Sequence, residues 1–394
     1  MKLIHISDLH IGKRVYEFPM LEDQKYILAQ ILAVTEREKA DGIMIAGDIY
    51  DKPVPPAEAV QVFDDFLTKL AALGITVFVV SGNHDSAERL AFGARLMSGR
   101  GVYLSPVYDG RVQKVCMQDT WGEVWIYLLP FIKPVVVRHA MEKRDSDNGE
   151  EIQDLKIETY QDALTAAVQG MQIDPSKRNI LVAHQFVTGA ARCESEEVQV
   201  GGLDQIDVSV FDKFDYVALG HLHSPQSVGR ETVRYCGTPL KYSFSEAGQE
   251  KSVTVVELAA KGETVIRTIP LIPLRDMKKI CGSYQEVMFR EFYQNMNTED
   301  YIQVTLTDEE DIPDGLQRLR TVYPNLMHLE YDNKRTRSVR NIEGAEKAEK
   351  KTELELFEEF YELQNNQEMS GQQRAFAQQM IQELLEKGRG GRNF

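Results

Sequence analysis

The first thirteen residues, MKLIHISDLHIGK (1–13), place a short apolar run directly before a polar cluster. Leu3 to Ile6 is typical of a buried strand, and Asp8 and His10 follow it at once. The same arrangement recurs in the clusters Gly47-Asp48-Ile49-Tyr50-Asp51, Gly82-Asn83-His84-Asp85, Ala183-His184 and Gly220-His221-Leu222-His223. In open α/β sheets, ligands bind outside the carboxyl ends of the strands. We therefore expect these clusters to meet at one edge of a sheet.

Helix-like and strand-like segments alternate around these clusters. Residues 22–39 have apolar positions at near-helical spacing, and residues 56–73 begin with Pro and are followed by Gly74, as helices often are. Further strands are predicted at 42–46, 75–80, 102–104, 124–129, 180–183, 216–219 and 253–258. The polar segment 143–158 is interpreted as a solvated excursion that leads into a helix over 160–171. This order predicts an α/β layered domain.

Composition limits the classes of protein that the chain can represent. The 394 residues include 43% hydrophobic and 27% charged residues, which is ordinary for a globular protein of about two or three domains. The formal charge of −16 argues against a generic polyanion binder, but an enzyme can still reach phosphates through bound metal ions. The four cysteines form no CxxC pair, there is no signal peptide, and no apolar run reaches the roughly 18 residues of a membrane span. A cytoplasmic protein is expected.

The polar clusters supply the donors of a divalent-metal site. Carboxylate, imidazole and amide oxygen suit Mn, Fe or Zn, and Asp8 and His10 lie on one side of an extended segment. The candidate ligands are Asp8, His10, Asp48, Asn83, His184, His221 and His223. Seven ligands are too many for one ion with open positions, whereas they fit two ions that share a carboxylate. Such a pair activates a water molecule as the nucleophile and clamps a phosphoryl group.

His84 is left over beside a candidate ligand. It is suited to act as a general acid that protonates the leaving oxygen, with Asp85 as its orienting partner. Each cluster alone is more often a turn, a cap or a structural histidine. The ordered set of five, each after an apolar strand, favours a shared role. The remaining histidines, His5, His139 and His328, are interpreted as ordinary core or surface residues.

The C-terminal third is organised differently. Pro270 and Pro273 mark a boundary, and residues 274–335 contain a small β–α–β unit. Residues 336–353 form a highly charged linker, and residues 354–387 contain two amphipathic helical segments, with Ser370 as the N-cap of the second. These segments either pack on their own domain or bind a partner helix, and the intervening linker favours the partner. Their acidic charge makes them a poor DNA contact.

The motifs DLH, GDIYD, GNHD, AHQ and GHLH occur in the order of the calcineurin-like metallophosphoesterases, which the chain resembles. MKLIHISDLHIGK, GNHDSAERL and YCGTPLKYSFSEAG (235–248) are more closely similar to the SbcD family, the nuclease subunits of bacterial SbcC–SbcD complexes. The resemblance implies a four-layer α/β/β/α sandwich over residues 1–273, a DNA-capping domain over 274–335 and partner-binding helices over 354–387.

The resemblance also implies how the ligands are shared. Asp8, His10, Asp48 and His223 would hold one ion, and Asp48, Asn83, His184 and His221 the other, with Asp48 bridging. The ions would be Mn²⁺, His84 would be the catalytic histidine, and Asp51 would support the site without binding metal.

The function implied by the resemblance is a Mn²⁺-dependent DNA exonuclease and endonuclease. It would process double-strand ends and hairpins in DNA repair and recombination, as a homodimer within a heterotetramer. An SbcC-type coiled-coil ATPase would bind the C-terminal helices and supply any ATP dependence, since the chain has no Walker A sequence. The alternatives are a small-substrate phosphodiesterase and a non-catalytic scaffold of the same fold. The intact ligand set argues against the scaffold, and the C-terminal regions argue against the small-substrate enzyme.

Overall fold

The computed structural model describes residues 1–148, 156–187, 189–190, 206–337, 354, 357–358, 361 and 369–389. The chain divides into two compact units, Met1–Asp276 and Met277–Phe394. Within the described ranges, no helix has the length and apolar character needed to cross a bilayer. Most of the predicted charged linker, from residue 338 to 353, lies outside the described residues.

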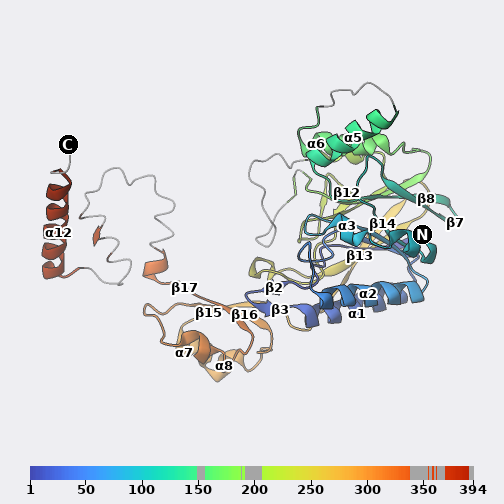
Figure 1. The fold of residues 1–394 in the computed structure, drawn as a ribbon. Helices are drawn as coiled ribbons and strands as arrows, with labels where there is room; N and C mark the ends of the chain where they lie inside the picture. The colour runs from blue at the N-terminus through green and yellow to red at the C-terminus, as the bar shows by residue number, and fades with distance from the viewer. Residues whose placement is uncertain are drawn as a thin grey trace. The chain divides into compact units, whose positions relative to one another are not determined.

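Two six-stranded sheets form the centre of the first unit (Figure 1). The order in the first sheet is β14 (Thr264–Pro270), β13 (Ser252–Leu258), β1 (Lys2–Ile6), β4 (Gly42–Ala46), β5 (Thr76–Val80) and β6 (Val102–Leu104). The neighbouring strands β1, β4, β5 and β6 are parallel to one another. β13 pairs antiparallel with both β1 and β14. The carboxyl ends of β1, β4 and β5 therefore lie at the same edge.

The second sheet repeats this plan with a parallel centre and antiparallel edges. Its order is β11 (Gln226–Val228), β12 (Arg230–Tyr235), β10 (Tyr216–Gly220), β9 (Arg178–His184), β8 (Gly122–Leu129) and β7 (Gln113–Asp119). β8, β9, β10 and β12 are parallel, and Gly220 is paired with His184 in the register of β10 and β9. The ends of these two strands are thus side by side.

The two sheets pack face to face, and helices cover their outer faces. Met44 and Phe78 from the first sheet share a buried core with Ile180 and Ala218 from the second. The alternate residues of β9 and β10 contribute to a core with α5 (Pro134–Asn148) and α6 (Tyr160–Gly170). α1 (Leu21–Arg37) and α2 (Ala57–Ala72) lie on the opposite side of the sandwich (Figure 1). Strands buried on both faces are near-continuous apolar runs, as β4 (GIMIA) and β5 (TVFVV) are. The predicted α/β/β/α sandwich is confirmed.

Local signals account for much of this first unit. Pro56 caps α2, and Gly74 follows the helix with a φ of +73°. The short elements β2 (Arg14–Val15), β3 (Phe18–Pro19), α3 (Ala87–Leu90) and α4 (Ala94–Met97) connect the larger ones. The polar segment predicted from residue 143 begins inside α5, which continues through Asn148, and residues 149–155 lie outside the described residues.

The second unit contains a three-stranded parallel sheet. Its strands are β15 (Met277–Gly282), β16 (Tyr301–Leu306) and β17 (Leu326–Tyr331), with β16 in the centre. The short helices α7 (Tyr284–Met288) and α8 (Arg290–Tyr293) follow β15, and α9 (Gly315–Leu319) connects β16 to β17. Val304 and Tyr323 are fully buried in its core. The predicted β–α–β unit corresponds to β16, α9 and β17, and it is extended by one strand and two helices.

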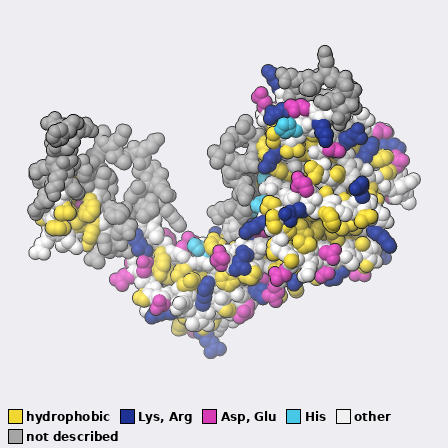
Figure 2. Space-filling model, in the orientation of Figure 1, with side chains coloured by type: hydrophobic (Ala, Val, Ile, Leu, Met, Phe, Trp, Pro, Cys, Tyr) yellow, Lys and Arg dark blue, Asp and Glu magenta, His cyan; other side chains and the backbone are white. Residues whose placement is uncertain are grey.

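The C-terminal helix α12 (Gly371–Arg389) begins where its capping residue was predicted. The Gln373 backbone N–H donates to Ser370 Oγ at 3.3 Å, and Gln373 Oε1 accepts from the Ser370 N–H at 2.8 Å. This reciprocal pair satisfies two donors at the helix start. Apolar side chains are visible on the described part of this segment (Figure 2), and Phe376 is 67% exposed. Phe360 and Leu363 of the first predicted amphipathic segment lie outside the described residues.

Candidate metal centre

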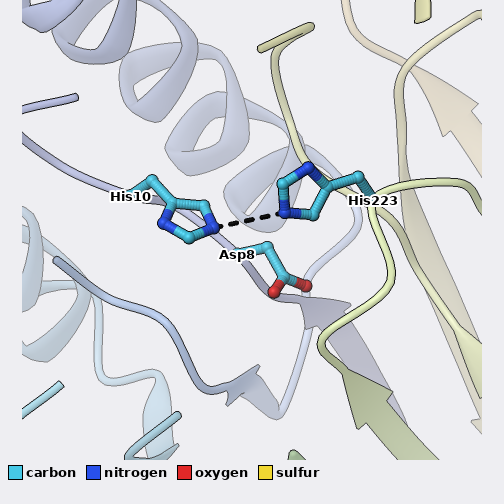
Figure 3. Close-up of side chains that lie close together, drawn as sticks. All are labelled: Asp8, His10 and His223. Carbon is cyan, nitrogen blue, oxygen red and sulfur yellow. Dashed lines mark hydrogen bonds between the residues drawn. The ribbon is translucent and has the colours of Figure 1, made fainter. Parts of the chain in front are cut away.

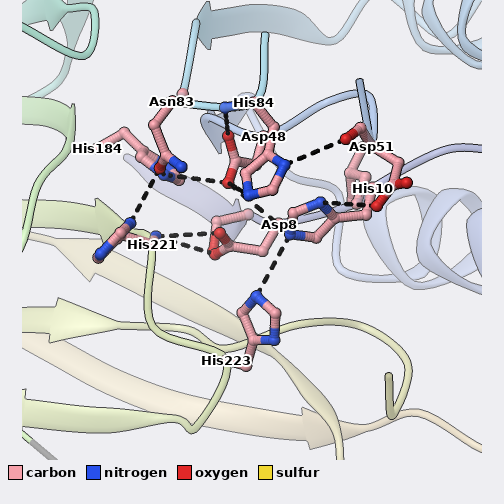
Figure 4. A network of polar contacts seen from close by, with 12 residues as sticks. Asp8, His10, Asp48, Asp51, Asn83, His84, His184, His221 and His223 are labelled. Carbon is pink, nitrogen blue, oxygen red and sulfur yellow. Dashed lines mark hydrogen bonds and ion pairs between the residues drawn. The ribbon is translucent and has the colours of Figure 1, made fainter. Parts of the chain in front are cut away.

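The seven predicted ligands gather at the carboxyl ends of the central strands (Figure 4). Asp8 follows β1, Asp48 follows β4, and Asn83 follows β5 in the first sheet. In the second sheet, His184 ends β9, and His221 and His223 follow β10. Residues more than 200 positions apart are thereby brought into one small volume, as the strand-end argument predicts.

One side of the cluster consists of Asp8, His10 and His223, which we call the His10 half (Figure 3). Each of these residues offers one donor atom, and the three atoms lie within 4.8 Å of one another. The Nε2 atoms of His10 and His223 are 3.3 Å apart. All three side chains are buried, so the donors face one another rather than solvent.

The other side consists of Asn83, His184 and His221, which we call the His184 half. Asn83 Oδ1 lies 2.9 Å from His184 Nε2 and 3.0 Å from His221 Nδ1. His184 Nδ1 donates to the Ala46 carbonyl at 2.8 Å. Because a carbonyl only accepts, the proton of a neutral His184 ring is on Nδ1, and Nε2 presents its lone pair to the cluster.

Asp48 faces both halves. Its Oδ2 lies 3.3 Å from His184 Nε2 and 3.8 Å from His10 Nε2, while Oδ1 accepts the His84 backbone N–H at 2.9 Å. Burial acts to raise the Asp48 pKa, but the His184, His10 and His84 rings outweigh burial and hold it well below its usual range. This carboxylate is therefore ionised and placed as a bridging ligand would be.

Asp8 is in the opposite electrostatic situation. Burial raises its pKa to about 6, and Asp48 adds to the shift, although His184, His223 and Ser7 act against it. His10 Nδ1 is buried and has no hydrogen-bond partner among the described residues, and the Asp51 carboxylate lies 3.8 Å from it (Figure 4). Buried carboxylates with ring nitrogens turned toward one another are an arrangement that cations stabilise. The donor set lacks thiolate and suits hard or borderline divalent ions.

The backbone of the centre is strained at several ligands. Asp8, His10, Asp48 and His221 have φ values of 54°, 44°, 50° and 105°, which non-glycine residues rarely adopt. Such conformations cluster at functional sites, where the surrounding structure holds them. Gly82 allows the strand ends to approach, since a Cβ there would lie only 2.1 Å from Asp48 Oδ1.

His84 lies at the edge of the cluster and is 18% exposed. Its Nδ1 is 3.1 Å from the Asp51 carbonyl oxygen, and its Nε2 is 4.0 Å from Asp48 Oδ2. The ring is therefore oriented by the Asp51 backbone. Asp51 also accepts from Lys13 Nζ at 2.7 Å, which is consistent with a supporting position.

The expected role of Asp85 as the orienting partner of His84 needs correction. The Asp85 carboxylate accepts the backbone N–H groups of Ile49, Tyr50 and Gly82 at 2.9 to 3.0 Å. It thus connects the loop after β5 to the loop after β4. Burial raises its pKa to about 6, with Asp48 adding to the shift and the N–H groups opposing it.

Sequence comparisons place this combination of fold and cluster in a known family. Residues 1–225 match the calcineurin-like phosphoesterase family, and residues 273–365 match the Type 5 capsule protein repressor C-terminal domain. The chain is 31% identical to the SbcD subunit of the nuclease SbcCD of Staphylococcus epidermidis, over 98% of this chain and 100% of the relative. The chain belongs to the SbcD family of calcineurin-like phosphoesterases.

Two solved structures have chains that are similar to this one at low sequence identity. A dimetal phosphatase from Danio rerio is 12% identical with a TM-score of 0.39, covering 69% of this chain and 96% of that one. A protein from Thermus thermophilus is 11% identical with a TM-score of 0.36, covering 68% of this chain and 98% of that one. Membership of the SbcD family follows from the sequence matches alone.

Several residues that support the centre of this SbcD-family chain escaped the sequence analysis. Glu246 Oε1 lies 3.9 Å from His223 Nδ1, and Glu246 Oε2 accepts from the buried Lys251 Nζ at 2.6 Å. Gln24 Nε2 donates to the His10 carbonyl at 2.7 Å and to Tyr242 Oη at 3.0 Å. Tyr242 and Glu246 fall in the 235–248 segment that resembles the SbcD family. That resemblance was the signal that could have identified them.

The other histidines lie outside the centre. His5 is fully buried between the sheets, where its Nδ1 contacts Tyr216 Oη at 2.9 Å and burial lowers its pKa to about 3. The His139 side chain is 73% exposed. His328 is a partly buried residue of β17. The ordinary core and surface roles expected for these residues agree with these positions.

Proposed function

We propose that this chain is a metal-dependent nuclease subunit that hydrolyses phosphodiester bonds at DNA double-strand ends and hairpins. The observation that carries the proposal is the convergence of all seven donors and His84 in a chain 31% identical to an SbcD nuclease subunit. Processing of such ends belongs to DNA repair and recombination, and the proposed location of the chain is the cytoplasm.

The donor geometry and the fold family support two divalent ions, and we propose that they are Mn²⁺. Asp8, His10, Asp48 and His223 would hold one ion, and Asp48, Asn83, His184 and His221 the other. When bound, the two ions would activate a water molecule and neutralise charge on the phosphoryl oxygens. The protein's contribution is to hold Asp48 ionised between the halves and, through the Ala46 carbonyl, to turn His184 Nε2 toward the cluster.

His84 is the proposed general acid. The Asp51 carbonyl can only accept, so the Nδ1 of His84 carries a proton, and Nε2 is the atom that gains or loses one. Nε2 lies at the partly exposed edge of the site, where a leaving sugar oxygen could receive its proton. Asp85 contributes indirectly, by holding the loop that carries His84.

The second unit and the C-terminal helix are assigned to DNA and partner binding in this proposal. Residues 274–335 would be the capping domain, yet Arg335 and Arg337 pair with Asp311 and Asp332 at 2.8 and 2.9 Å. Arginine side chains that are already paired with carboxylates neutralise few phosphates. DNA binding by this chain alone should therefore be weak and sensitive to salt. The exposed apolar residues of α12 would bind an SbcC-type coiled-coil ATPase.

A homodimer within a heterotetramer is also proposed. Phe92 and Leu96, in the segment of α3 and α4, are 84% and 85% exposed. Two large apolar side chains on one short segment are typical of a protein–protein contact.

Cleavage assays test the proposal. The full chain is incubated with linear and hairpin double-stranded DNA, or with a simple phosphodiester, in Mn²⁺, Mg²⁺ or EDTA. Mn²⁺-dependent cutting of DNA that EDTA abolishes is the expected result. Hydrolysis of the simple phosphodiester alone, even with the ATPase added, would contradict the nuclease and favour a small-substrate phosphodiesterase.

A further inference from the structure

Three ion pairs fix the end of the first unit, immediately before Met277. Arg275 Nη1 donates to Asp23 Oδ2 at 2.8 Å, and Nη2 donates to Glu22 Oε2 at 2.6 Å. Asp276 Oδ1 accepts from Lys241 Nζ at 2.7 Å. The Asp23 side chain is fully buried and that of Arg275 is 25% exposed, so their contact is largely shielded from water. We call these residues, Arg275 and Asp276 with their partners, the linker clamp.

Two clamp residues, Asp23 and Lys241, are each followed in the chain by a residue that contacts the backbone of Leu9 or His10. Gln24 follows Asp23, donates to the His10 carbonyl at 2.7 Å and accepts the Gly12 N–H at 2.9 Å. Tyr242 follows Lys241 and donates its hydroxyl hydrogen to the Leu9 carbonyl. Gln24 and Tyr242 are also hydrogen-bonded to each other at 3.0 Å.

These contacts continue to the rings of the proposed ligands. The Tyr242 ring packs edge to face on His10, with centroids 5.7 Å apart, and its centroid is 6.4 Å from that of His223. The His184 half is held differently, by the Ala46 carbonyl and by Asn83. The contacts that run inward from the clamp therefore lead to the His10 half.

We propose that the linker clamp is a positioning device that couples the last residues of the first unit to metal affinity in the His10 half. Asp23 and Gln24 are consecutive residues in the first turn of α1, and Lys241 and Tyr242 are consecutive in the chain. A displacement of Arg275 or Asp276 therefore shifts the side chains that orient the His10 backbone and ring. The inference rests on the proposed two-metal site, because it distinguishes the two halves by their ions.

The test is a Mn²⁺ titration of the full chain without DNA, by calorimetry and by electron paramagnetic resonance. Arg275→Gln should lower the Mn²⁺ affinity of one of the two binding steps by about 10-fold and leave the other step unchanged. A loss of about 10-fold is the lower end of what mutation of residues that support metal ligands typically causes. Arg275→Lys, which can keep one ion pair, should restore most of the lost affinity. The matched control is Arg267→Gln. Arg267 is a partly exposed residue of β14 that pairs with Glu38 and Glu257, and its loss should change the Mn²⁺ affinity of neither step.

Lys241→Met provides a second, milder variant, because its partner Asp276 is 35% exposed. It should affect the same binding step in the same direction. Unchanged binding in both variants, or an equal loss at both steps, would overturn the clamp. Fewer than two Mn²⁺ ions bound to the unaltered chain would contradict the proposed two-metal site and the clamp together, whereas two normal binding steps that the variants leave unchanged would contradict the clamp alone.

Discussion

The two halves of the candidate metal centre are held by different parts of the chain. His184 is fixed by the backbone, since its Nδ1 donates to the Ala46 carbonyl and Gly47 and Gly220 leave space for its ring. His223 is supported by side chains of a later segment, Glu246 and Tyr242. Backbone support follows from the register of parallel strands, whereas side-chain support can be removed one group at a time. A mutation near the His184 half should therefore have an abrupt effect, whereas mutations near the His10 half should weaken it gradually.

Gly220→Ala should have the largest effect. A Cβ at this position would lie 1.8 Å from the Ala46 carbonyl oxygen and 2.7 Å from His184 Nδ1, so the strand ends must separate. We expect a loss of about 3 kcal/mol in the free energy of unfolding, measured with urea, together with loss of the ion in the His184 half. Gly170→Ala, at an open position at the end of α6, is the control and should be neutral or slightly stabilising. A Gly220→Ala protein as stable as the control would show that the backbone is not rigid there.

Glu246→Gln should act on the other half. It removes the charge that pairs with Lys251, whose side chain is only 4% exposed, and weakens the support of His223. Breaking a buried pair of this kind costs about 3 kcal/mol, and Mn²⁺ affinity should fall about 10- to 100-fold at one step only. Calorimetric titration measures the affinity. Glu257→Gln, which alters an exposed pair with Arg267, should cost under about 1 kcal/mol. An equal weakening of both binding steps by Glu246→Gln would contradict separate support.

Asp119→Asn should lower stability without affecting either half. Hydrogen bonds from Arg178 and from the N-terminal amino group hold the Asp119 pKa below its ordinary value of 3.8, although burial opposes them. A lowered pKa means that the ionised group stabilises the fold above pH 3.8 and that this contribution is lost as the pH falls through the native pKa. The variant should be about 2 kcal/mol less stable at neutral pH and lose less stability on acidification. Thermal unfolding between pH 7 and acid conditions measures both effects. A change in Mn²⁺ affinity would show that the opposite end of the sheet also influences the centre.

The central strands and the polar clusters could be predicted because their signals are local, whereas the outer strands β7, β11, β12 and β14 were not predicted. Each central strand is an apolar run, and each proposed ligand follows within a few residues of a strand end. Parallel pairing then brings the clusters together without further information. β15 was missed because its sequence, MKKICG, interrupts the apolar pattern with two lysines, and only Met277 and Ile280 are buried.

The supporting contacts could not be predicted because they depend on packing between distant segments. Glu246 and His223 lie 3.9 Å apart in the structure, although β11 and β12 separate them in the chain. Asp85 was predicted to orient its sequence neighbour His84. Its carboxylate instead accepts the backbone N–H groups of Ile49 and Tyr50, which follow β4. Backbone donors carry no signature in a sequence, so a carboxylate that binds them resembles one that orients a side chain.

The central claim is that the cluster binds metal while His84 moves a proton. The most direct measurement compares His84→Gln with the unaltered chain in one preparation, for Mn²⁺ stoichiometry and for hydrolysis of a simple phosphodiester. We predict two Mn²⁺ ions per chain in both proteins and a rate lowered about 10²- to 10⁴-fold in the variant. Loss of metal in proportion to activity, or an unchanged rate, would contradict the assignment.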